Sequence, residues 1–470
     1  MTDPTAHAAP EVDFASLPLA AELLTNLASL GYHAMTPIQA ASLPAMLAGR
    51  DVIARGKTGS GKTAAFGLGL LSRLAVESFR VQSLVLCPTR ELADQVAGEL
   101  RRLARSLPNV KILTLCGGAP LGPQLNSLEH GAHVIVGTPG RVEEHLRKGS
   151  LSLADLTTLV LDEADRMLDM GFQEALERIV RETPASRQTL LFSATYAEAV
   201  LPIAERMMRE PLTVEVESTH DDASIRQHFF RVADEPARLA ALCELLLHYR
   251  PVSSVVFCNT KIETREVAEG LSAAGFSAVA LHGDLEQRDR DETLVRFANK
   301  SVSVLVATDV AARGLDIDAL DAVFNHQIAR DLEVHVHRIG RTGRAGSRGV
   351  ACTLVGVRED YRLEKLGDFL GQPLECEPLP ASRGGDATPF AAPMVTLQID
   401  GGKKRKVRPG DILGALTGDG GIAGDAVGKI KVLERSAYIA VERGVADAAL
   451  EQLKAGTLKG RSFRARRIGR

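Results

Sequence analysis

The chain has 470 residues, of which 45% are hydrophobic and 24% are charged. It is long enough for about three domains and can bury substantial cores. Six cysteines show no CxxC pair and no regular spacing, which argues against a disulfide framework and fits a reducing compartment. No apolar run reaches 18 residues and no signal peptide is present, so we expect a cytoplasmic protein without a membrane partner.

The net charge of −3 hides an asymmetry between the end of the chain and the rest. Residues 394–470 carry 16 Lys and Arg against 8 Asp and Glu, whereas the remainder carries 40 against 51. A basic tail on an acidic body predicts a polyanionic partner for the tail. A solvated charged surface is the alternative.

A phosphate-binding loop is predicted at residues 56–63, which read Gly-Lys-Thr-Gly-Ser-Gly-Lys-Thr. An apolar run, Asp51–Ala54, precedes the loop, and a helix-prone segment, Ala64–Leu74, follows it. Backbone N–H groups and a helix N-terminus favour a phosphate there. We expect Lys62 to reach the β and γ phosphates and Thr63 to bind Mg²⁺. A chance Gly-rich turn is the alternative, but it would not require the strand before and the helix after.

Apolar runs then alternate with amphipathic stretches, which predicts βαβ units and a parallel sheet with helices on both faces. The runs are Ser83–Cys87, Lys111–Leu115, His133–Val136, Leu159–Leu161 and Thr189–Phe192. Polar clusters follow four of them, at residues 88–93, 138–141, 162–165 and 193–195. Ligands gather at the carboxyl ends of parallel strands, so the active edge should lie at these clusters.

Two carboxylates follow the run that ends at Leu161. Asp162 suits a water-mediated Mg²⁺ ligand, and Glu163 suits the base that orients or deprotonates the attacking water. An acidic turn at a strand end is the alternative. Upstream of the loop, Gln39 could read an adenine edge and an aromatic could stack on the ring. Alone, that signal favours a surface Gln.

After a polar segment at residues 217–222 the alternation restarts, which predicts a second α/β domain without a phosphate loop. Its runs are Ser254–Phe257, Ser277–Leu281, Val302–Ala307, Ala322–Asn325 and Val350–Val355. Arg341 and Arg344 lie in one Gly-containing loop and could stabilise charge on a transferring phosphoryl group. A surface basic loop is the alternative. We expect arginine fingers that arrive on domain closure.

The tail reads as a βαββαβ unit, which resembles an RRM-like fold. Residues 377–393 are rich in Pro, Gly and Ala and read as a flexible linker before it. A standard RRM stacks bases on several aromatics, but here only Tyr438 stands in the central strands. RNA binding should therefore depend mainly on Lys403, Lys404, Arg405, Lys406, Arg408 and the C-terminal arginines. The predicted domains are residues 1–216, 217–376 and 394–470.

Together these residues resemble the DEAD-box RNA helicases, ATP-dependent enzymes with two RecA-like domains. The tetrad that names the family stands at residues 162–165, and the motifs occur in family order from Phe14 to Leu370. The tail resembles the RNA-binding domain of DbpA-type helicases. The resemblance implies a fold of two tandem RecA-like parallel-sheet domains plus a C-terminal RRM-like α+β domain.

The resemblance also implies roles for individual residues. Lys62, Asp162, Glu163, Arg341 and Arg344 would form the catalytic set. ATP would be bound by Phe14, Tyr32, Gln39, Gly59, Ser60, Gly61, Lys62, Thr63 and Asp316, and Mg²⁺ by Thr63 and Asp162. RNA would be bound by Arg90, Gly118, Thr138, Arg141, Thr308, Lys403, Lys404, Arg405, Lys406 and Tyr438. Ser193 and Thr195 would couple hydrolysis to strand separation.

The implied function is local unwinding of short RNA duplexes by cooperative closure around ATP and RNA. The tail would direct a monomeric enzyme to a hairpin of 23S rRNA in precursors of the large ribosomal subunit. One alternative is an ATP-gated RNA clamp or chaperone without rRNA specificity. A DNA translocase is disfavoured by the segments around Gln39 and Thr138–Arg141.

Overall fold

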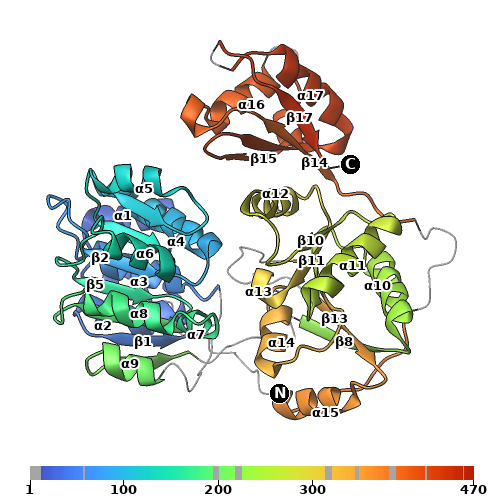
Figure 1. The fold of residues 1–470 in the computed structure, drawn as a ribbon, viewed down its shortest axis with the longest axis horizontal. Coiled ribbons are helices and arrows are strands. Elements are labelled where there is room, and N and C mark those ends of the chain that lie inside the picture. The colour runs from blue at the N-terminus through green and yellow to red at the C-terminus, as the bar shows by residue number, and fades with distance from the viewer. Residues whose placement is uncertain are drawn as a thin grey trace, which may run out of the picture. The chain divides into compact units, whose positions relative to one another are not determined.

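The structure is a computed structural model that describes residues 12–56, 59–193, 201–216, 225–312, 320–343, 349–380, 388–418, 421–458 and 460–469. Three β-sheets organise these residues (Figure 1). The chain divides into two compact units. The first contains the N-terminal sheet, and the second contains the other two sheets.

The first sheet is wholly parallel. Its strands lie in the order β3 (Ile112–Leu115), β4 (Val134–Gly137), β2 (Ser83–Leu86), β5 (Thr158–Leu161), β6 (Gln188–Ser193), β1 (Val52–Arg55) and β7 (Leu212–Glu215). The central strands are buried along their whole length, as strands covered on both faces are. One core cluster contains Val160 and Phe192, and a second contains the alternate residues Leu161 and Leu191. The sheet therefore has a hydrophobic layer on each face.

The helices of this unit form those two layers. They are η1 (Phe14–Ser16), α1 (Ala21–Ser29), α2 (Pro37–Leu47), α3 (Lys62–Leu71), α4 (Arg90–Leu103), η2 (Ala104–Ser106), α5 (Leu121–Leu128), α6 (Pro139–Arg147), α7 (Ala164–Asp169), α8 (Gln173–Arg181) and α9 (Leu201–Met207). Phe66 of α3 packs on Phe192 of β6 with ring centroids 5.2 Å apart. This contact fixes the helix that follows the phosphate-binding loop against the centre of the sheet.

The second unit begins with another parallel sheet. The strand order is β10 (Ala278–Leu281), β11 (Val304–Thr308), β9 (Ser254–Cys258), β12 (Ala322–Asn325), β13 (Gly349–Gly356) and β8 (Ile225–Val232). The helices are α10 (Glu235–Tyr249), α11 (Lys261–Ala273), α12 (Gln287–Ala298), α13 (Asp309–Ala312), α14 (Leu332–Ile339) and α15 (Asp360–Leu370). This repetition of the βα pattern confirms the second RecA-like domain.

The tail is a four-stranded antiparallel sheet in the order β15 (Val427–Val432), β16 (Ala437–Glu442), β14 (Met394–Ile399) and β17 (Ala465–Ile468). The helical segments are η4 (Lys403–Arg405), α16 (Pro409–Thr417), η5 (Gly424–Ala426), η6 (Arg443–Val445) and α17 (Ala446–Ala455). Leu397, Ile439 and Leu416 share one core between the sheet and the helices. The predicted RRM-like α+β domain is confirmed.

Two features differ from the sequence expectations. β7 and β8 were not among the expected runs, because each is an edge strand with a partly exposed face and lacks a continuous apolar stretch. The expected flexible linker is also anchored at both described ends. Glu377 N donates to Phe229 O of β8 over 2.7 Å, and Phe390 packs edge-on against Phe276.

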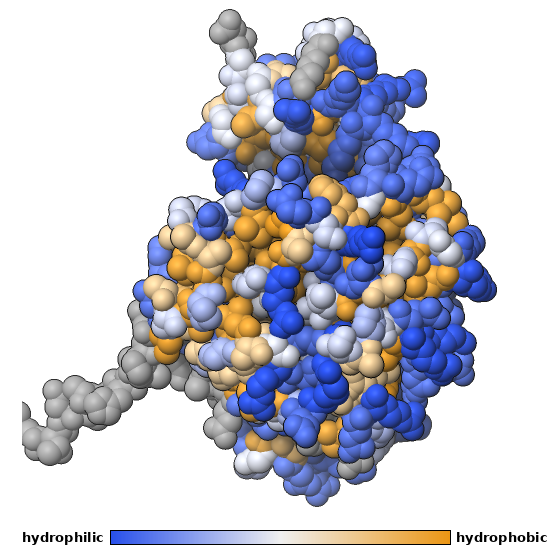
Figure 2. Space-filling view, turned by 90° about the vertical axis from the view of Figure 1, so that its left-hand side faces the viewer, coloured by the Kyte–Doolittle hydropathy of each residue, from blue (hydrophilic) through white to orange (hydrophobic). Residues whose placement is uncertain are grey.

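The viewed face of the molecule carries intermixed hydrophilic and hydrophobic residues (Figure 2). Single exposed apolar side chains such as Phe79 are ordinary, since apolar atoms make up more than half of a typical protein surface. Within the described ranges, no helix is both long and apolar enough to span a membrane.

A buried histidine makes the stability of the second unit depend on pH. His335 of α14 stacks on Phe229 and is fully buried. Burial, assisted by the Arg338 charge, lowers the pKa of His335 to about 3. Because the folded pKa lies below the unfolded value near 6.5, the stabilisation is complete above that pH and is lost as the pH falls toward 3.

We expect the free energy of unfolding to fall by up to ~1.4 kcal/mol per pH unit below about 6.5 because of this residue. Hydrogen exchange of β8 and β13 amides at pH 5.5 and 7.5 measures it, after correction for intrinsic exchange. His335→Phe should flatten the dependence. Equal slopes in the variant and the wild type would contradict the assignment to His335.

Candidate nucleotide and RNA sites

The strand order of the first sheet places the motif residues in a row along one edge. The carboxyl ends of β1, β6 and β5 lead to the phosphate-binding loop, Ser193 and Asp162. The neighbouring ends of β2, β4 and β3 lead to the polar segments at residues 88–93, 138–141 and 117–118. Adjacent strands lie about 4.8 Å apart, so two contiguous sites result. One carries the phosphate-binding chemistry, and the other carries the segments expected to bind RNA.

The loop is held by its own lysine and by β6. Lys62 is the first residue of α3 and is 7% exposed, and its Nζ donates to Gly56 O over 2.7 Å. Gly56 N donates to Ser193 O over 3.2 Å. The ammonium therefore points back into the loop, where a phosphate oxygen would compete with Gly56 O for it. Lys57 and Thr58 lie outside the described residues.

Gln39 contacts the loop directly. Its Nε2 donates to Gly61 O over 3.1 Å, and its Oε1 accepts from Thr36 N over 2.9 Å. Thr36 Oγ1 donates to Ser60 O over 2.8 Å. The start of α2 thus fixes the position of the loop. The expected contact with an adenine edge would have to use the remaining amide N–H and oxygen lone pair.

The two aromatic residues expected at the nucleotide base are engaged in packing and hydrogen bonding. Phe14 is 2% exposed within the main core, and its ring meets Tyr32 edge-on at 6.5 Å. Tyr32 OH donates to Glu99 Oε1 over 2.8 Å. Burial and this carboxylate raise the pKa of Tyr32 to about 12. Tyr32 is half-buried, whereas Phe14 is buried, so of these two rings Tyr32 has the larger accessible surface.

Gly61→Ala should disrupt the loop. Gly61 has φ +92°, and a Cβ there would lie 2.5 Å from Gln39 Nε2. Left-handed backbone in a non-glycine residue costs about 1–3 kcal/mol, and the clash adds to it. We expect ATP affinity to fall by about tenfold or more, measured by titration with a fluorescent ATP analogue. Gly98→Ala, in open space on α4, is the matched control and should bind normally.

Asp162 and Glu163 leave β5 as buried carboxylates. Asp162 is 4% exposed, and burial, opposed by the Lys62 ammonium, raises its pKa to about 7. Glu163 adopts φ 53° and ψ 52°, a conformation uncommon outside glycine, and is the N-cap of α7. Its Oε2 accepts no hydrogen bond from the described residues and lies 3.3 Å from Arg166 Nη1. An outlier backbone and a desolvated carboxylate together are typical of functional sites.

These side chains fit a magnesium nucleotide. A cation beside Asp162 would restore its ionised form and remove the penalty of burial. The loop presents N–H groups and the Lys62 ammonium to phosphate. In the described residues no cluster of three His, Cys, Asp or Glu side chains could hold a metal ion. Mg²⁺ that keeps waters and phosphate oxygens needs only one or two protein oxygens, here Asp162 and Thr63.

On the other half of the edge, Arg141 organises the backbone. Its guanidinium donates to Ala119 O and to Gln124 Oε1, both at 3.0 Å, and pairs with Glu144 at 3.1 Å. It thereby ties α6 to the exposed loop that contains Gly118, which has φ +75°. Arg141 is thus placed as a positioning residue, with little surface left for RNA.

Two further expected RNA residues begin helices at this edge. Thr138 is the N-cap of α6, and Arg90 is the first residue of α4. Both are partly exposed. Helix N-termini attract phosphate groups, so this half of the edge suits a nucleic-acid backbone.

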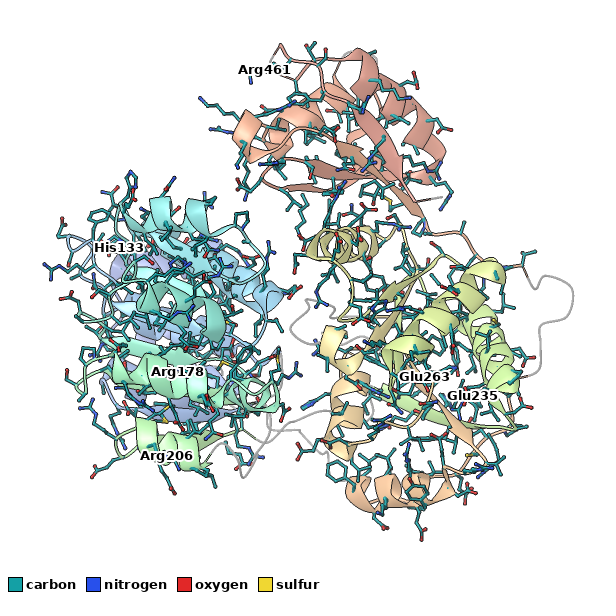
Figure 3. The ribbon with its side chains drawn as sticks, viewed as in Figure 1. His133, Arg178, Arg206, Glu235, Glu263 and Arg461 are labelled. Atoms are coloured by element: carbon teal, nitrogen blue, oxygen red, sulfur yellow. The ribbon has the colours of Figure 1, made fainter. Side chains whose placement is uncertain are left out.

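In the second unit, a buried arginine of α14 joins the polar residues that follow β9 and β11. Arg338 is 1% exposed and holds both carboxylate oxygens of Asp309, at 2.6 and 2.7 Å. It also donates to Asn259 Oδ1 at 2.8 Å and to Gln327 O at 3.0 Å. Glu263, labelled in Figure 3, accepts from Gln327 Nε2 at 2.8 Å and extends this network. Thr308 and Asp309 at the end of β11 are thereby fixed relative to α14.

The arginine fingers are only partly described. Arg341 follows α14, is 6% exposed, and its carbonyl accepts from Leu320 N over 3.1 Å. Arg344, Asp316 and Thr195 lie outside the described residues.

The tail presents its basic loop on the surface. Lys403, Lys404, Arg405 and Lys406 are all exposed. Lys403 N and Lys404 N donate to the carbonyls of Leu433 and Glu434, over 2.8 and 3.0 Å.

Gly401 lets Phe463 approach so closely that a Cβ would lie 2.4 Å from the ring. Phe463 in turn carries the Arg405 guanidinium at 5.7 Å. The basic loop is therefore a fixed surface that suits a phosphate backbone.

Tyr438 differs from its expected role. Its side chain is 3% exposed and packs against Val295 of α12, so in this structure it presents no ring to RNA. Reasoning from the sequence also missed Arg338, although it lies only three residues before Arg341. Arg338 could have been recognised as a buried cation between the polar residues that follow β9 and β11. That recognition requires the strand order of the sheet, which the sequence alone does not give.

Comparisons with known proteins agree with this geometry. Residues 36–202 match the DEAD/DEAH box helicase family, residues 237–346 match the helicase conserved C-terminal domain, and residues 396–467 match the DbpA RNA binding domain.

Among curated proteins, the chain is 56% identical over 443 residues to the ATP-dependent RNA helicase DbpA of Escherichia coli K12, covering 94% of this chain and 96% of that protein. It is 44% identical over 353 residues to the DEAD-box ATP-dependent RNA helicase CshA of Geobacillus kaustophilus, with 75% of each chain covered. Among solved structures, Saccharomyces cerevisiae Dbp5 bound to RNA and ADP BeF3 matches with a TM-score of 0.70 and 32% identity. That match covers 78% of this chain and 95% of that one.

Proposed function

The chain belongs to the DEAD-box family of ATP-dependent RNA helicases and carries a DbpA RNA-binding domain. We propose that it locally unwinds short RNA duplexes next to a hairpin of 23S rRNA. Its partners would be precursors of the large ribosomal subunit, and it would act as a monomer in the cytoplasm. The observation that carries the proposal is the contiguous edge of the first sheet, where phosphate and RNA motifs share neighbouring strand ends.

We propose the following division of labour at the nucleotide. Lys62 leaves Gly56 O for a phosphate oxygen. Asp162 and Thr63 would hold Mg²⁺, which when bound would neutralise phosphate charge. Glu163 orients the attacking water and accepts its proton. Arg341 and Arg344 stabilise charge on the transferring phosphoryl group. Ser193, whose carbonyl accepts from the loop, and Thr195 relay the state of the nucleotide to the RNA side.

RNA selection is assigned to the tail and RNA distortion to the core. Contacts from Arg90, Gly118, Thr138 and Thr308 to the sugar–phosphate backbone give affinity without sequence choice. The exposed basic loop supplies the polyanion-binding surface of the tail. The alternative, an ATP-gated RNA clamp, predicts that duplex release continues at its multiple-turnover rate with a nonhydrolysable ATP analogue.

The test compares ATPase stimulation by two RNAs of equal length, a ribosomal fragment that contains the hairpin and poly-U. We expect the wild-type chain to prefer the fragment. Lys403→Gln, Lys404→Gln and Lys406→Gln combined should remove the preference and lessen its salt dependence. Arg105→Gln, Arg147→Gln and Arg181→Gln remove equal charge from exposed sites of the first unit and should change nothing. Equal stimulation of the wild type by both RNAs would contradict the rRNA targeting.

A further inference from the structure

Part of the outer face of the tail sheet, on β14 and β16, is buried although it faces away from the tail's own core. Side chains alternate between the two faces of a strand, so Leu397 and Ile439 point inward while Thr396, Gln398 and Tyr438 point outward. These three outward residues are at most 5% exposed. In an RRM this is the face on which bases stack. Something other than RNA covers it here.

The cover is α12 and the turn that follows it. Val295 of α12 forms a separate hydrophobic cluster with Tyr438 and Ile468 of the tail. Thr396 Oγ1 accepts from Asn299 Nδ2 over 3.2 Å and lies 2.7 Å from Ser301 Oγ. An apolar anchor and a buried polar pair on one face define a single docking position.

The same helix reaches the expected RNA loop of the second RecA-like domain. Arg290 of α12 donates through Nη2 to Ala311 O over 2.8 Å. Ala311 N in turn donates to Thr308 Oγ1 over 3.3 Å. One helix thus contacts the Thr308 loop through Arg290 and the tail sheet through Val295. The two residues are five positions apart, within about 8 Å along a helix axis.

The connecting segment adds a second attachment. Phe390 packs edge-on against Phe276 at 5.9 Å and lies under the Arg250 guanidinium at 5.4 Å. Ala392 is fully buried, and its carbonyl accepts from Arg443 Nε over 2.8 Å. The connecting segment is thus attached to the second RecA-like domain through Phe390 and to the tail through Ala392.

We propose that α12 is a fixed joint between the tail and the Thr308 loop, and that Tyr438 is a positioning residue at this joint rather than an RNA contact. An RNA hairpin held on the basic loop is then presented to the core at a set distance, so a duplex beside it is delivered to Thr308. The inference rests on the proposed function. It adds that selectivity requires the docked joint as well as affinity of the tail for RNA.

Two variants disrupt the joint from opposite sides. Val295→Asp and Tyr438→Glu each place a charge in the cluster, and neither side chain belongs to the core of its own domain. We expect each to lower the hairpin-over-poly-U preference of the ATPase by about tenfold, while poly-U stimulation and hairpin affinity stay unchanged. Phe369→Glu, an exposed apolar-to-acidic change on α15, is the control. Preservation of the preference in both joint variants would overturn the inference.

A third variant locks the joint. Ser301→Cys with Thr396→Cys replaces hydroxyls that lie 2.7 Å apart and should form a disulfide on mild oxidation, with each single variant as control. The oxidised full chain should keep the hairpin-over-poly-U preference of the ATPase. Reduction of the disulfide should leave that preference unchanged. Loss of the preference on oxidation, or failure to form the bond with hairpin RNA bound, would overturn the inference. Absence of the hairpin preference in the wild type would instead contradict the rRNA targeting. The disulfide yield with and without RNA would then test, independently of the preference, whether the tail docks on α12.

Discussion

Glu163→Gln should leave ATP and RNA binding intact while steady-state ATPase falls by about 10²- to 10⁴-fold. The amide keeps the size of the carboxylate but cannot accept a proton. The backbone that aims it is set by the αL conformation at the start of α7, which the substitution does not change. Binding is measured by titration with a fluorescent nucleotide and with labelled RNA, and turnover by phosphate release.

Glu182→Gln provides the control for that experiment. Glu182 is exposed just after α8, so the same chemical change there should leave turnover unchanged. An Glu163→Gln chain with wild-type turnover would remove this carboxylate from the catalytic set. Loss of nucleotide binding would instead make it a positioning group for the loop.

Arg338→Ala should have the largest effect on stability. It removes a buried guanidinium that neutralises Asp309 and satisfies Asn259, leaving a carboxylate without its partner. Breaking such a pair costs about 3–5 kcal/mol in free energy of unfolding. We also expect RNA-stimulated ATPase to be lost, because the Thr308 loop and α14 lose their common anchor. Urea unfolding and ATPase assays measure the two effects.

Arg338→Lys separates charge from geometry. A lysine ammonium cannot hold both oxygens of Asp309 and the Asn259 oxygen in one plane. The Lys variant should therefore recover little of the stability and little of the RNA-stimulated ATPase. Arg358→Ala removes an exposed arginine from the same unit and should be neutral. Full activity of the Lys variant would show that only the charge matters at this position.

The parallel sheets and the phosphate-binding loop could be predicted from the sequence because their signals are local. Buried strands give apolar runs, and the loop between Arg55 and Lys62 has a required spacing. The edge strands β7 and β8 give no such run. The antiparallel tail was also predictable, because its strand and helix segments follow the βαββαβ order of an RRM-like fold.

Contacts between distant segments could not be predicted in the same way. Gln39 was expected at a base, yet its amide is bonded to Thr36 and Gly61, a pairing that depends on how α2 packs beside the loop. Tyr438 was expected at RNA because it stands in a central strand. Whether that face is open depends on α12, more than 130 positions earlier in the chain.

The most direct test of the account is strand separation by the full chain. A short RNA duplex is joined to the ribosomal hairpin, and the same duplex without the hairpin serves as the reference. Unwinding of both is followed at saturating ATP and again with a nonhydrolysable analogue. We predict rapid multiple-turnover unwinding only with ATP and only beside the hairpin. Equal unwinding of both duplexes, or unwinding that persists without hydrolysis, would contradict the account.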